Sequence, residues 1–290
     1  MRESKTFETP EPIAVTLAMN VADVRISAGE RTDTVVTVTA NDASKKADVE
    51  AAQQTRIEFS DGRLLVKAPR SWKHYTIFKF GRESVDVSIE LPAGSSVEGE
   101  VWVGDLSCIG RLGGCRYTTG AGDIRLEHAG PVQVSTGAGR LGVDVAEGKS
   151  EITGSGQMRI GELRGPAVVK NLNGPIWIGL AADDLRCSSS NGEISVDRAL
   201  GAVEAKTANG DVRVGEVVRG TVAVKTAYGR LEIGIREGTA ALLDVASSFG
   251  RVENSLQASE GPQPSDETVQ LRARTSYGDI LIHRSKEAAQ

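Results

Sequence analysis

The chain has 290 residues and a formal net charge of −5, and aromatic residues make up only 4% of it. The acidic balance gives no broad electrostatic basis for nucleic-acid binding, and no apolar run approaches the roughly 20 residues of a membrane span. The first ten residues carry charges of both signs and no apolar core, so no secretory signal is visible and a cytoplasmic location is expected.

Residues 1–103 indicate irregular β-strand coils. The stretch 34–39 is rich in β-branched residues, and 84–91 alternates apolar and polar residues as a strand does. Asp61-Gly62 is a hairpin turn signal. Residues 43–54 are the one stretch here that favours a helix. No linker composition separates this region from the rest of the chain.

Residues 62–82 are chemically distinctive, because they combine cations and aromatic rings without any acid. Such a surface suits a partner or an anionic surface. The other interpretation is a long loop that caps the N-terminal end of a repeat structure. The candidate contact residues are Lys67, Arg70, Trp72, Lys73, Tyr75, Phe78 and Phe80.

From Gly104 to Ile282, one short phrase occurs ten times: glycine, any residue, an aliphatic residue, any residue, and usually a second aliphatic one. Gly192-Glu-Ile-Ser-Val196 is a representative copy. Successive glycines are 18, 17, 17, 18, 18, 18, 19, 21 and 28 residues apart. A fixed period near eighteen indicates a repeat architecture.

Each repeat contains two short alternating runs, which is too little to bury an apolar face alone. Stacked coils would create a continuous interior, so the sequence predicts an all-β, single-domain parallel β-helix with coils of about 18 residues. Residues 1–103 would form N-terminal coils and a cap, 104–284 the regular solenoid and 285–290 a polar tail. Ile152 lies one residue closer to its glycine than its counterparts do, which predicts a local slip.

Polar and aromatic columns mark the corners of these coils. Three residues before the glycines stand hydroxyl or amide side chains that can bond along the stack. They are Thr119, Thr136, Thr153, Asn171, Ser189, Thr207, Thr226, Ser247 and Thr275. Directly before the glycines, Asn173, Asn191 and Asn209 suit an amide ladder, and Tyr228, Phe249 and Tyr277 suit an aromatic stack.

Some β-helix enzymes cleave polysaccharides with carboxylates on adjacent coils, so Asp105 with Asp123 and Glu193 with Asp211 are candidate pairs. Each acid follows a turn glycine, however, where acids commonly bond backbone N–H groups. Arg140 and Arg230 come next in the column and could pair with Asp123 and Asp211. We therefore expect a solvated surface here.

No other pattern indicates catalysis. The glycines from 137 to 142 match a dinucleotide-binding spacing, but alternation continues where that motif needs a helix. His74, His128 and His283 are scattered, without metal or triad spacing. Cys108, Cys115 and Cys187 occupy inward slots and suit small buried apolar residues. We expect no cofactor, no metal and no catalytic residues.

The glycine-led phrase Gly-Asp-Val-x-Val, preceded by Ile89-Glu-Leu-Pro-Ala-Gly-Ser95, resembles the bacterial putative-adhesin domain family of unknown function with β-strand repeats. The resemblance covers about residues 7–282. It implies a right-handed parallel β-helix and supplies no catalytic residues to transfer.

The function that these observations favour is a non-enzymatic interaction or scaffold module with an unidentified protein partner. The alternatives are a self-polymerising cytoskeletal-type scaffold and a carbohydrate-active β-helix. Any end-to-end contact is predicted to use residues 271–284, with Tyr277, Ile280 and Ile282, because a last coil exposes an unpaired strand edge.

Overall fold

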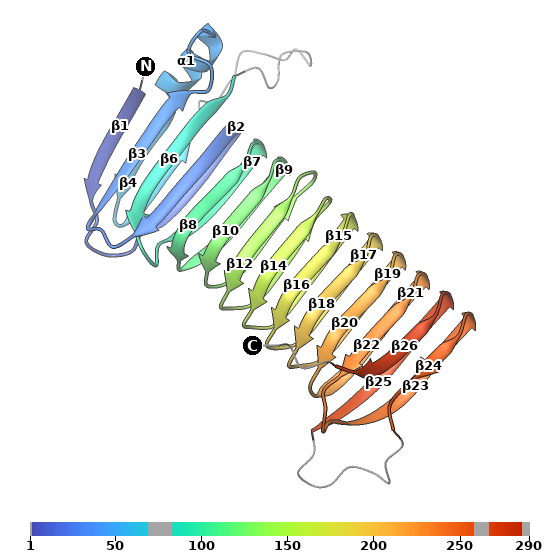
Figure 1. The fold of residues 1–290 in the computed structure, drawn as a ribbon. Coiled ribbons are helices and arrows are strands. Elements are labelled where there is room, and N and C mark those ends of the chain that lie inside the picture. The colour runs from blue at the N-terminus through green and yellow to red at the C-terminus, as the bar shows by residue number, and fades with distance from the viewer. Residues whose placement is uncertain (1, 69–82, 258–266, 286–290) are drawn as a thin grey trace. The chain divides into compact units, whose positions relative to one another are not determined.

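The structure is a computed structural model that describes residues 2–68, 83–257 and 267–285. The chain forms two compact units, Met1–Leu141 and Gly142–Gln290, and both are built from β-solenoid coils (Figure 1). Each coil places one strand in each of two sheets. The predicted all-β parallel solenoid is thereby confirmed.

The described residues of the first unit form eleven strands and one helix, and β12 (Leu141–Ala146) begins at the last residue of the unit. Its elements are β1 (Arg2–Glu8), β2 (Ala14–Gly29), β3 (Asp33–Ala40), α1 (Lys46–Gln54), β4 (Arg56–Ser60), β5 (Arg63–Lys67), β6 (Val85–Pro92), β7 (Ser96–Val103), β8 (Leu106–Leu112), β9 (Gly114–Ala121), β10 (Ile124–Ala129) and β11 (Val132–Thr136).

Strand β2 is long enough to serve both sheets of the first unit. Its first half pairs in parallel with β5 and β7, and its second half pairs in parallel with β6 and β8. The antiparallel strands β1, β3 and β4 lie on the N-terminal side of this coil. The predicted hairpin at Asp61-Gly62 joins β4 to β5, with both residues at positive φ, and α1 confirms the predicted helix.

Lys5 and Phe7 tie β1 to β4 across the N-terminal end. The Lys5 Nζ donates to the Ile57 carbonyl oxygen at 3.1 Å, and the rings of Phe7 and Phe59 stack with centroids 5.0 Å apart. Aromatic stacking of this kind adds roughly 0.5–1.5 kcal/mol beyond the area it buries. Strands β1 and β4 therefore close this end of the unit and contact each other through these side chains.

The second unit continues the same design, with fourteen further strands where the structure describes it. They are β13 (Ser150–Gly154), β14 (Met158–Leu163), β15 (Ala167–Asn173), β16 (Ile176–Ala181), β17 (Leu185–Asn191), β18 (Ile194–Ala199), β19 (Val203–Asn209), β20 (Val212–Val217), β21 (Gly220–Tyr228), β22 (Leu231–Ile235), β23 (Ala240–Phe249), β24 (Val252–Asn254), β25 (Thr268–Tyr277) and β26 (Ile280–Arg284).

Parallel ladders run through both sheets of the second unit. One sheet has the order β13–β15–β17–β19–β21–β25–β23, and the other has the order β14–β16–β18–β20–β22–β26–β24. The final two strands in sequence are thus not the final two in space. Strands β25 and β26 lie between the β21–β22 coil and the β23–β24 coil.

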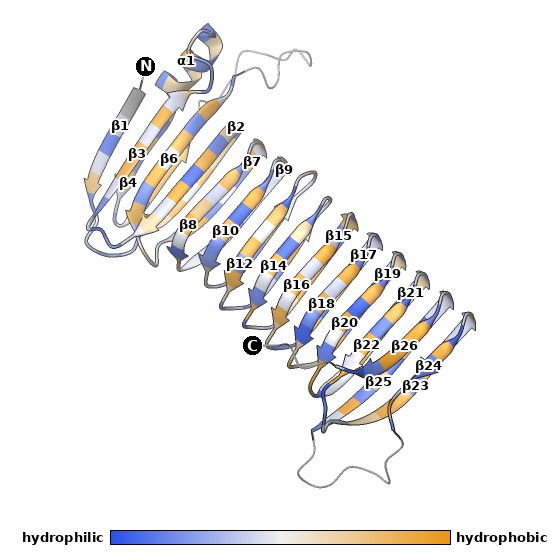
Figure 2. Cartoon of the chain, viewed as in Figure 1, coloured by the Kyte–Doolittle hydropathy of each residue, from blue (hydrophilic) through white to orange (hydrophobic). Residues whose placement is uncertain are grey.

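The interior follows the predicted alternation, which Figure 2 shows as orange and blue bands along the strands. Ile194 and Val212 face inward in adjacent coils, register with each other and are fully buried. The predicted slip at Ile152 is also real, since Ile152 registers with Val169 and Gly154 with Asn171. Thr153 consequently registers with Lys170 on the outer face, so its placement in the inward polar column is wrong.

Tyr117 on β9 is the largest side chain that is fully buried, and it fits because β7 has a glycine opposite it. Gly99 registers with Tyr117, and a Cβ atom at residue 99 would lie 2.6 Å from the tyrosine ring. The Tyr117 hydroxyl finds no hydrogen-bond partner in the described part of the chain, and burial raises its pKa. A phenol and a glycine in neighbouring coils therefore share the volume that two medium-sized aliphatic residues fill elsewhere.

The three cysteines are unpaired and buried, as predicted. Burial raises the pKa of Cys115 and of Cys187 to about 12, and burial together with nearby Cys115 raises the pKa of Cys108. Unfolded thiols ionise near pH 8.5. The folded chain thus favours the protonated thiols, and this contribution is complete below that pH and is lost as the pH rises towards 12.

We predict that the free energy of unfolding falls between pH 9 and 11 by about 1.4 kcal/mol per pH unit for each of these thiols. A variant with all three cysteines replaced by alanine should show a shallower fall, although it starts less stable. Urea titrations at several pH values measure both slopes. Equal slopes in the two proteins would contradict the assigned burial effect.

Candidate interaction surfaces

The predicted cationic and aromatic contact falls mostly outside the described residues. Lys67 lies at the end of β5 and is half-buried. Arg70, Trp72, Lys73, Tyr75, Phe78 and Phe80 belong to residues 69–82, which the structure does not describe. The choice between a partner contact and a cap therefore stays a prediction.

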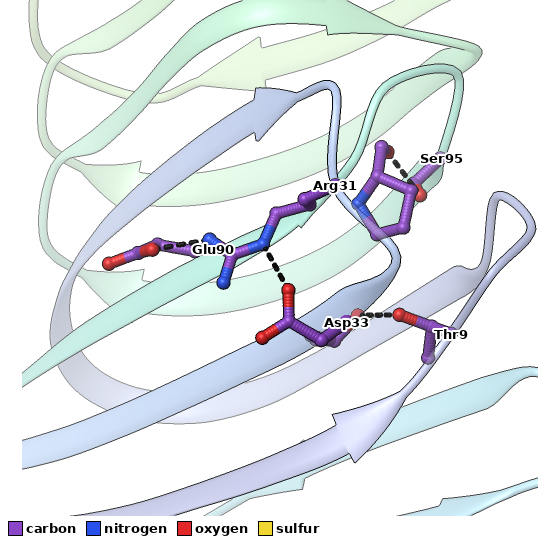
Figure 3. A network of polar contacts seen from close by, with 7 residues as sticks. Thr9, Arg31, Asp33, Glu90 and Ser95 are labelled. Carbon is purple, nitrogen blue, oxygen red and sulfur yellow. Dashed lines mark hydrogen bonds and ion pairs between the residues drawn. The ribbon is translucent and has the colours of Figure 1, made fainter.

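A polar network joins β3 to β6 in the first unit (Figure 3). The Arg31 Nε donates to Asp33 Oδ1 at 2.9 Å, and its Nη1 donates to Glu90. These bonds raise the pKa of Arg31, and the bond from Arg31 lowers the pKa of Asp33. Nearby, the hydroxyls of Thr9 and Thr34 lie 2.8 Å apart. Both acids are engaged by one guanidinium, so the network links β3 to β6.

Buried hydroxyl and amide side chains hold the corners of the coils. The side chains of Thr136, Thr207 and Asn171 donate to carbonyl oxygens of turn glycines in the neighbouring coil, at 2.9, 3.2 and 2.8 Å. This confirms the predicted bonding along the stack for these members of the column, whereas the buried Ser189 hydroxyl has no hydrogen-bond partner among the described residues. Each such bond satisfies a carbonyl oxygen that turns away from the sheet ladder.

The acids after the turn glycines serve the same purpose on the outer side. Asp105 Oδ1 accepts from the Asp123 N–H at 2.7 Å, and Asp123 Oδ1 accepts from the Arg140 N–H at 2.7 Å. Asp211 Oδ1 accepts from the Arg230 N–H at 2.8 Å. The prediction that acids at these positions bond nearby backbone groups is confirmed for these three aspartates, though not for Glu193, and the donor belongs to the next coil.

The side chain of Arg140 pairs with Asp123 as predicted, whereas the side chain of Arg230 pairs with Glu232 and not with Asp211. Partial burial works against ionisation of Asp123, but the bonds from the Arg140 N–H and guanidinium outweigh it and lower the pKa of this carboxyl. A general acid for glycoside cleavage needs a raised pKa. The environment of Asp123 therefore opposes that role.

A column of side chains, here called the corner ridge, runs along one corner of the second unit. It consists of Asn173, Asn191, Asn209, Tyr228, Tyr277 and Phe249, in their spatial order. All six are exposed. The Asn191 Nδ2 donates to Asn173 Oδ1 at 3.1 Å, and the Asn209 Nδ2 donates to Asn191 Oδ1 at 2.9 Å, which confirms the amide ladder.

The aromatic half of the corner ridge confirms the predicted stack, in an order that the sequence does not show. Tyr277 lies between the other two rings, 4.9 Å from Tyr228 and 4.8 Å from Phe249, and all three planes are nearly parallel. The exposed fractions are 56% for Tyr228, 46% for Tyr277 and 66% for Phe249. Three exposed rings are therefore held rigid by their own stacking and by the strands beneath them.

The predicted open edge at residues 271–284 is wrong. Strand β26 pairs with β22 on one side and β24 on the other, and Ile280 and Ile282 are fully buried. The outermost coil is β23–β24, because the 28-residue interval between Gly250 and Gly278 lets the chain return and insert one more coil. Tyr277 remains exposed as part of the corner ridge.

Among the described residues, no group of three or more histidine, cysteine or acidic side chains is arranged to hold a metal ion. The helix that these residues form is also too short to cross a membrane.

Three comparisons place the chain among known proteins. The family described as Toastrack DUF4097 matches residues 14–290. No curated protein matches the chain. A structure from Parabacteroides distasonis described as a putative lipid binding protein is 9% identical over 98% of this chain and 97% of that one, with a TM-score of 0.45.

Two further solved structures carry the description of putative adhesins. The one from Parabacteroides merdae is 11% identical over 98% of this chain and 96% of its own, with a TM-score of 0.40. The one from Bacteroides fragilis is 13% identical over 97% of each chain, with a TM-score of 0.35.

Proposed function

Because the chain belongs to the Toastrack DUF4097 family and consists of β-solenoid coils, we propose that it is a non-catalytic interaction module that binds a protein partner through the corner ridge. The observation that carries this proposal is the exposure of three stacked aromatic rings beside an amide ladder. Aromatic residues are enriched in protein interfaces and are costly to leave in water.

The rigidity of the corner ridge supports binding at low entropic cost. Each ring of the ridge is fixed by a neighbour less than 5 Å away, and the asparagine amides are fixed by one another. Side chains that are ordered before association lose little conformational freedom when a partner binds. Solenoids commonly use such extended surfaces of repeated side chains for recognition.

The hydrogen bonds that the candidate acids accept support a non-catalytic role. Asp105, Asp123 and Asp211 each accept a backbone hydrogen bond from the following coil, so their lone pairs have a structural use. The proposal also places the module in the cytoplasm. Three unpaired thiols suit a reducing compartment.

The test is affinity purification from the native host with the full chain as bait. Tyr228→Asn and Tyr277→Asn together would extend the amide ladder and remove two of the aromatic rings. We expect at least a tenfold loss of the specific partner in this double variant, with an unchanged far-ultraviolet circular dichroism spectrum.

The matched control is Trp102→Asn, which removes an exposed aromatic ring of the first unit that is not a member of the corner ridge. It should retain the partner. Equal recovery of the partner by the double variant and by the unmodified chain would refute the ridge as the binding surface.

A further inference from the structure

The β23–β24 coil differs from every coil beneath it in how little of its interior is covered. Leu243 and Val245 occupy inward slots on β23, yet both are only half-buried, and Val252 on β24 is 43% exposed. Their register partners one coil below, Leu271, Ala273 and Ile280, are fully buried. The apolar interior of the second unit is therefore open at this coil.

The backbone is open at the same place. Among the described residues, β23 pairs only with β25, and β24 pairs only with β26. In a parallel ladder, successive residues direct their backbone N–H and C=O groups to opposite edges of the strand. The backbone groups of every second residue of β23 therefore point away from β25. The Ala240 N–H donates to the Glu267 carbonyl oxygen, on the side of β25. The backbone groups of Ala241, Leu243, Val245 and Ser247 therefore face the free edge. Such an edge is a template for another strand.

The free face of Phe249 completes this surface. One face of its ring stacks on Tyr277, and 66% of the side chain is exposed. No charged side chain occupies an inward slot of β23 or β24. Asp244, which points outward, is paired with Arg272 and Arg274. The surface thus offers apolar slots, backbone hydrogen-bonding groups and one ring face, without a net charge that would repel an identical surface.

We propose that the β23–β24 coil docks against the same coil of a second copy of this chain, related by a two-fold axis. The partner surface must supply two strand edges at the separation of the two sheets, with apolar slots between them. A second β23–β24 coil has that outline. The N-terminal end does not repeat it, because the antiparallel β1 and β4 are tied across it by Lys5 and Phe7.

The two-fold arrangement follows from the corner at Phe249. Strand β23 runs towards this corner and β24 runs away from it. An axis through the corner, parallel to the strands, brings β23 of one copy beside β24 of the other in antiparallel orientation. The same rotation places Phe249 against its equivalent in the second copy, so the ring stack continues across the interface.

The contact is small enough to predict a reversible dimer. Strand β23 has ten residues and spans about 33 Å, and packed sheets lie about 10 Å apart. The end face of the β23–β24 coil therefore covers about 330 Å², well below the roughly 800 Å² that each partner buries in a standard stable interface. The dimer should form at high protein concentration and dissociate on dilution.

Sedimentation velocity of the purified full chain, across a wide concentration range, tests the proposal. The unmodified chain should shift from monomer to dimer and stop there. Val245→Lys places a charge in the open slot and should raise the dissociation constant at least tenfold, with little change in melting temperature because the amine can reach solvent. Ala246→Lys is the matched control, since residue 246 is exposed on the outer face of the same strand, and it should dimerise normally.

Val252→Lys gives a second route to the same result if Val245→Lys fails to fold. Phe249→Cys tests the axis, because the native thiols are buried and two copies of the new cysteine should form a disulfide-linked dimer under mild oxidation. A strict monomer at all concentrations overturns the proposal, and so does a series of higher oligomers. A dimer that is indifferent to both lysine variants overturns it as well.

The dimer surface shares Phe249 with the corner ridge, but the dimer and the proposed partner of the ridge are tested separately. The ridge test uses residues 228 and 277 and a host lysate, whereas the dimer test uses β23 and β24 and purified protein. Either result can fail while the other stands.

Discussion

Val212→Asp should unfold the second unit. Val212 is 0% exposed and registers with Ile194 on one side and Leu231 on the other. A carboxylate in this slot would lie between two buried aliphatic side chains, and an unpaired buried charge costs several kcal/mol. That is a large part of the roughly 5–15 kcal/mol by which a typical domain is stable. Thermal denaturation followed by circular dichroism should show the loss of the cooperative transition of this unit.

Val252→Asp is the matched control, because Val252 holds the equivalent position in the β23–β24 coil. The same carboxylate would reach water there, so the melting temperature should change by only a few degrees. If Val212→Asp melted cooperatively at the temperature of the unmodified chain, the coil register described above would be wrong.

Gly210→Ala should be nearly as damaging, although it adds a single methyl group. Gly210 has φ of 140°, a conformation that residues with a Cβ atom avoid. The added Cβ atom would lie 2.3 Å from the Gly192 carbonyl oxygen in the preceding coil, so it also collides with backbone. Backbone strain of this kind costs roughly 1–3 kcal/mol, and the collision adds to it. We expect a loss of at least about 3 kcal/mol in urea denaturation.

Gly238→Ala separates the two causes. Gly238 also has positive φ, at 78°, but no atom lies within 4 Å of where its Cβ atom would stand. It should lose only the strain contribution. Equal losses at the two positions would show that contact between coils is not what requires glycine at the corner.

The regular part of the fold could be predicted because one physical requirement repeats. A coil must place aliphatic residues inward at a two-residue period and turn at a glycine, and Ile194 and Val212 follow this rule. Both corner columns could be predicted for the same reason, since side chains at equal positions stack at the spacing of strands. The exception at Thr153 has a simple cause. The corner between Gly154 and Gly156 is one residue shorter, so the residue three positions before Gly156 lies on the outer face.

The order of the last two coils could not be predicted, because their inward residues are interchangeable. Leu243 and Val245 fit the same slots as Leu271 and Ala273, so alternation does not tell which pair lies outermost. One residue carried a signal. Asn254 holds the position that is aliphatic in nearly all of the remaining coils, and an amide there is tolerated only where water reaches it. The antiparallel strands at the N-terminal end lacked the repeated phrase altogether.

The inserted position of β25 and β26 also determines when the second unit can finish folding. During synthesis the chain emerges from its N-terminus, and most solenoids can add each new coil to the one already formed. Here residues 240–254 emerge before the coil on which they rest, so they must wait until residues 268–284 have been made. A chain cut after residue 267 would lack the residues of only one coil, β25–β26. It would nevertheless lose two coils, because the β23–β24 coil rests on β25 and β26.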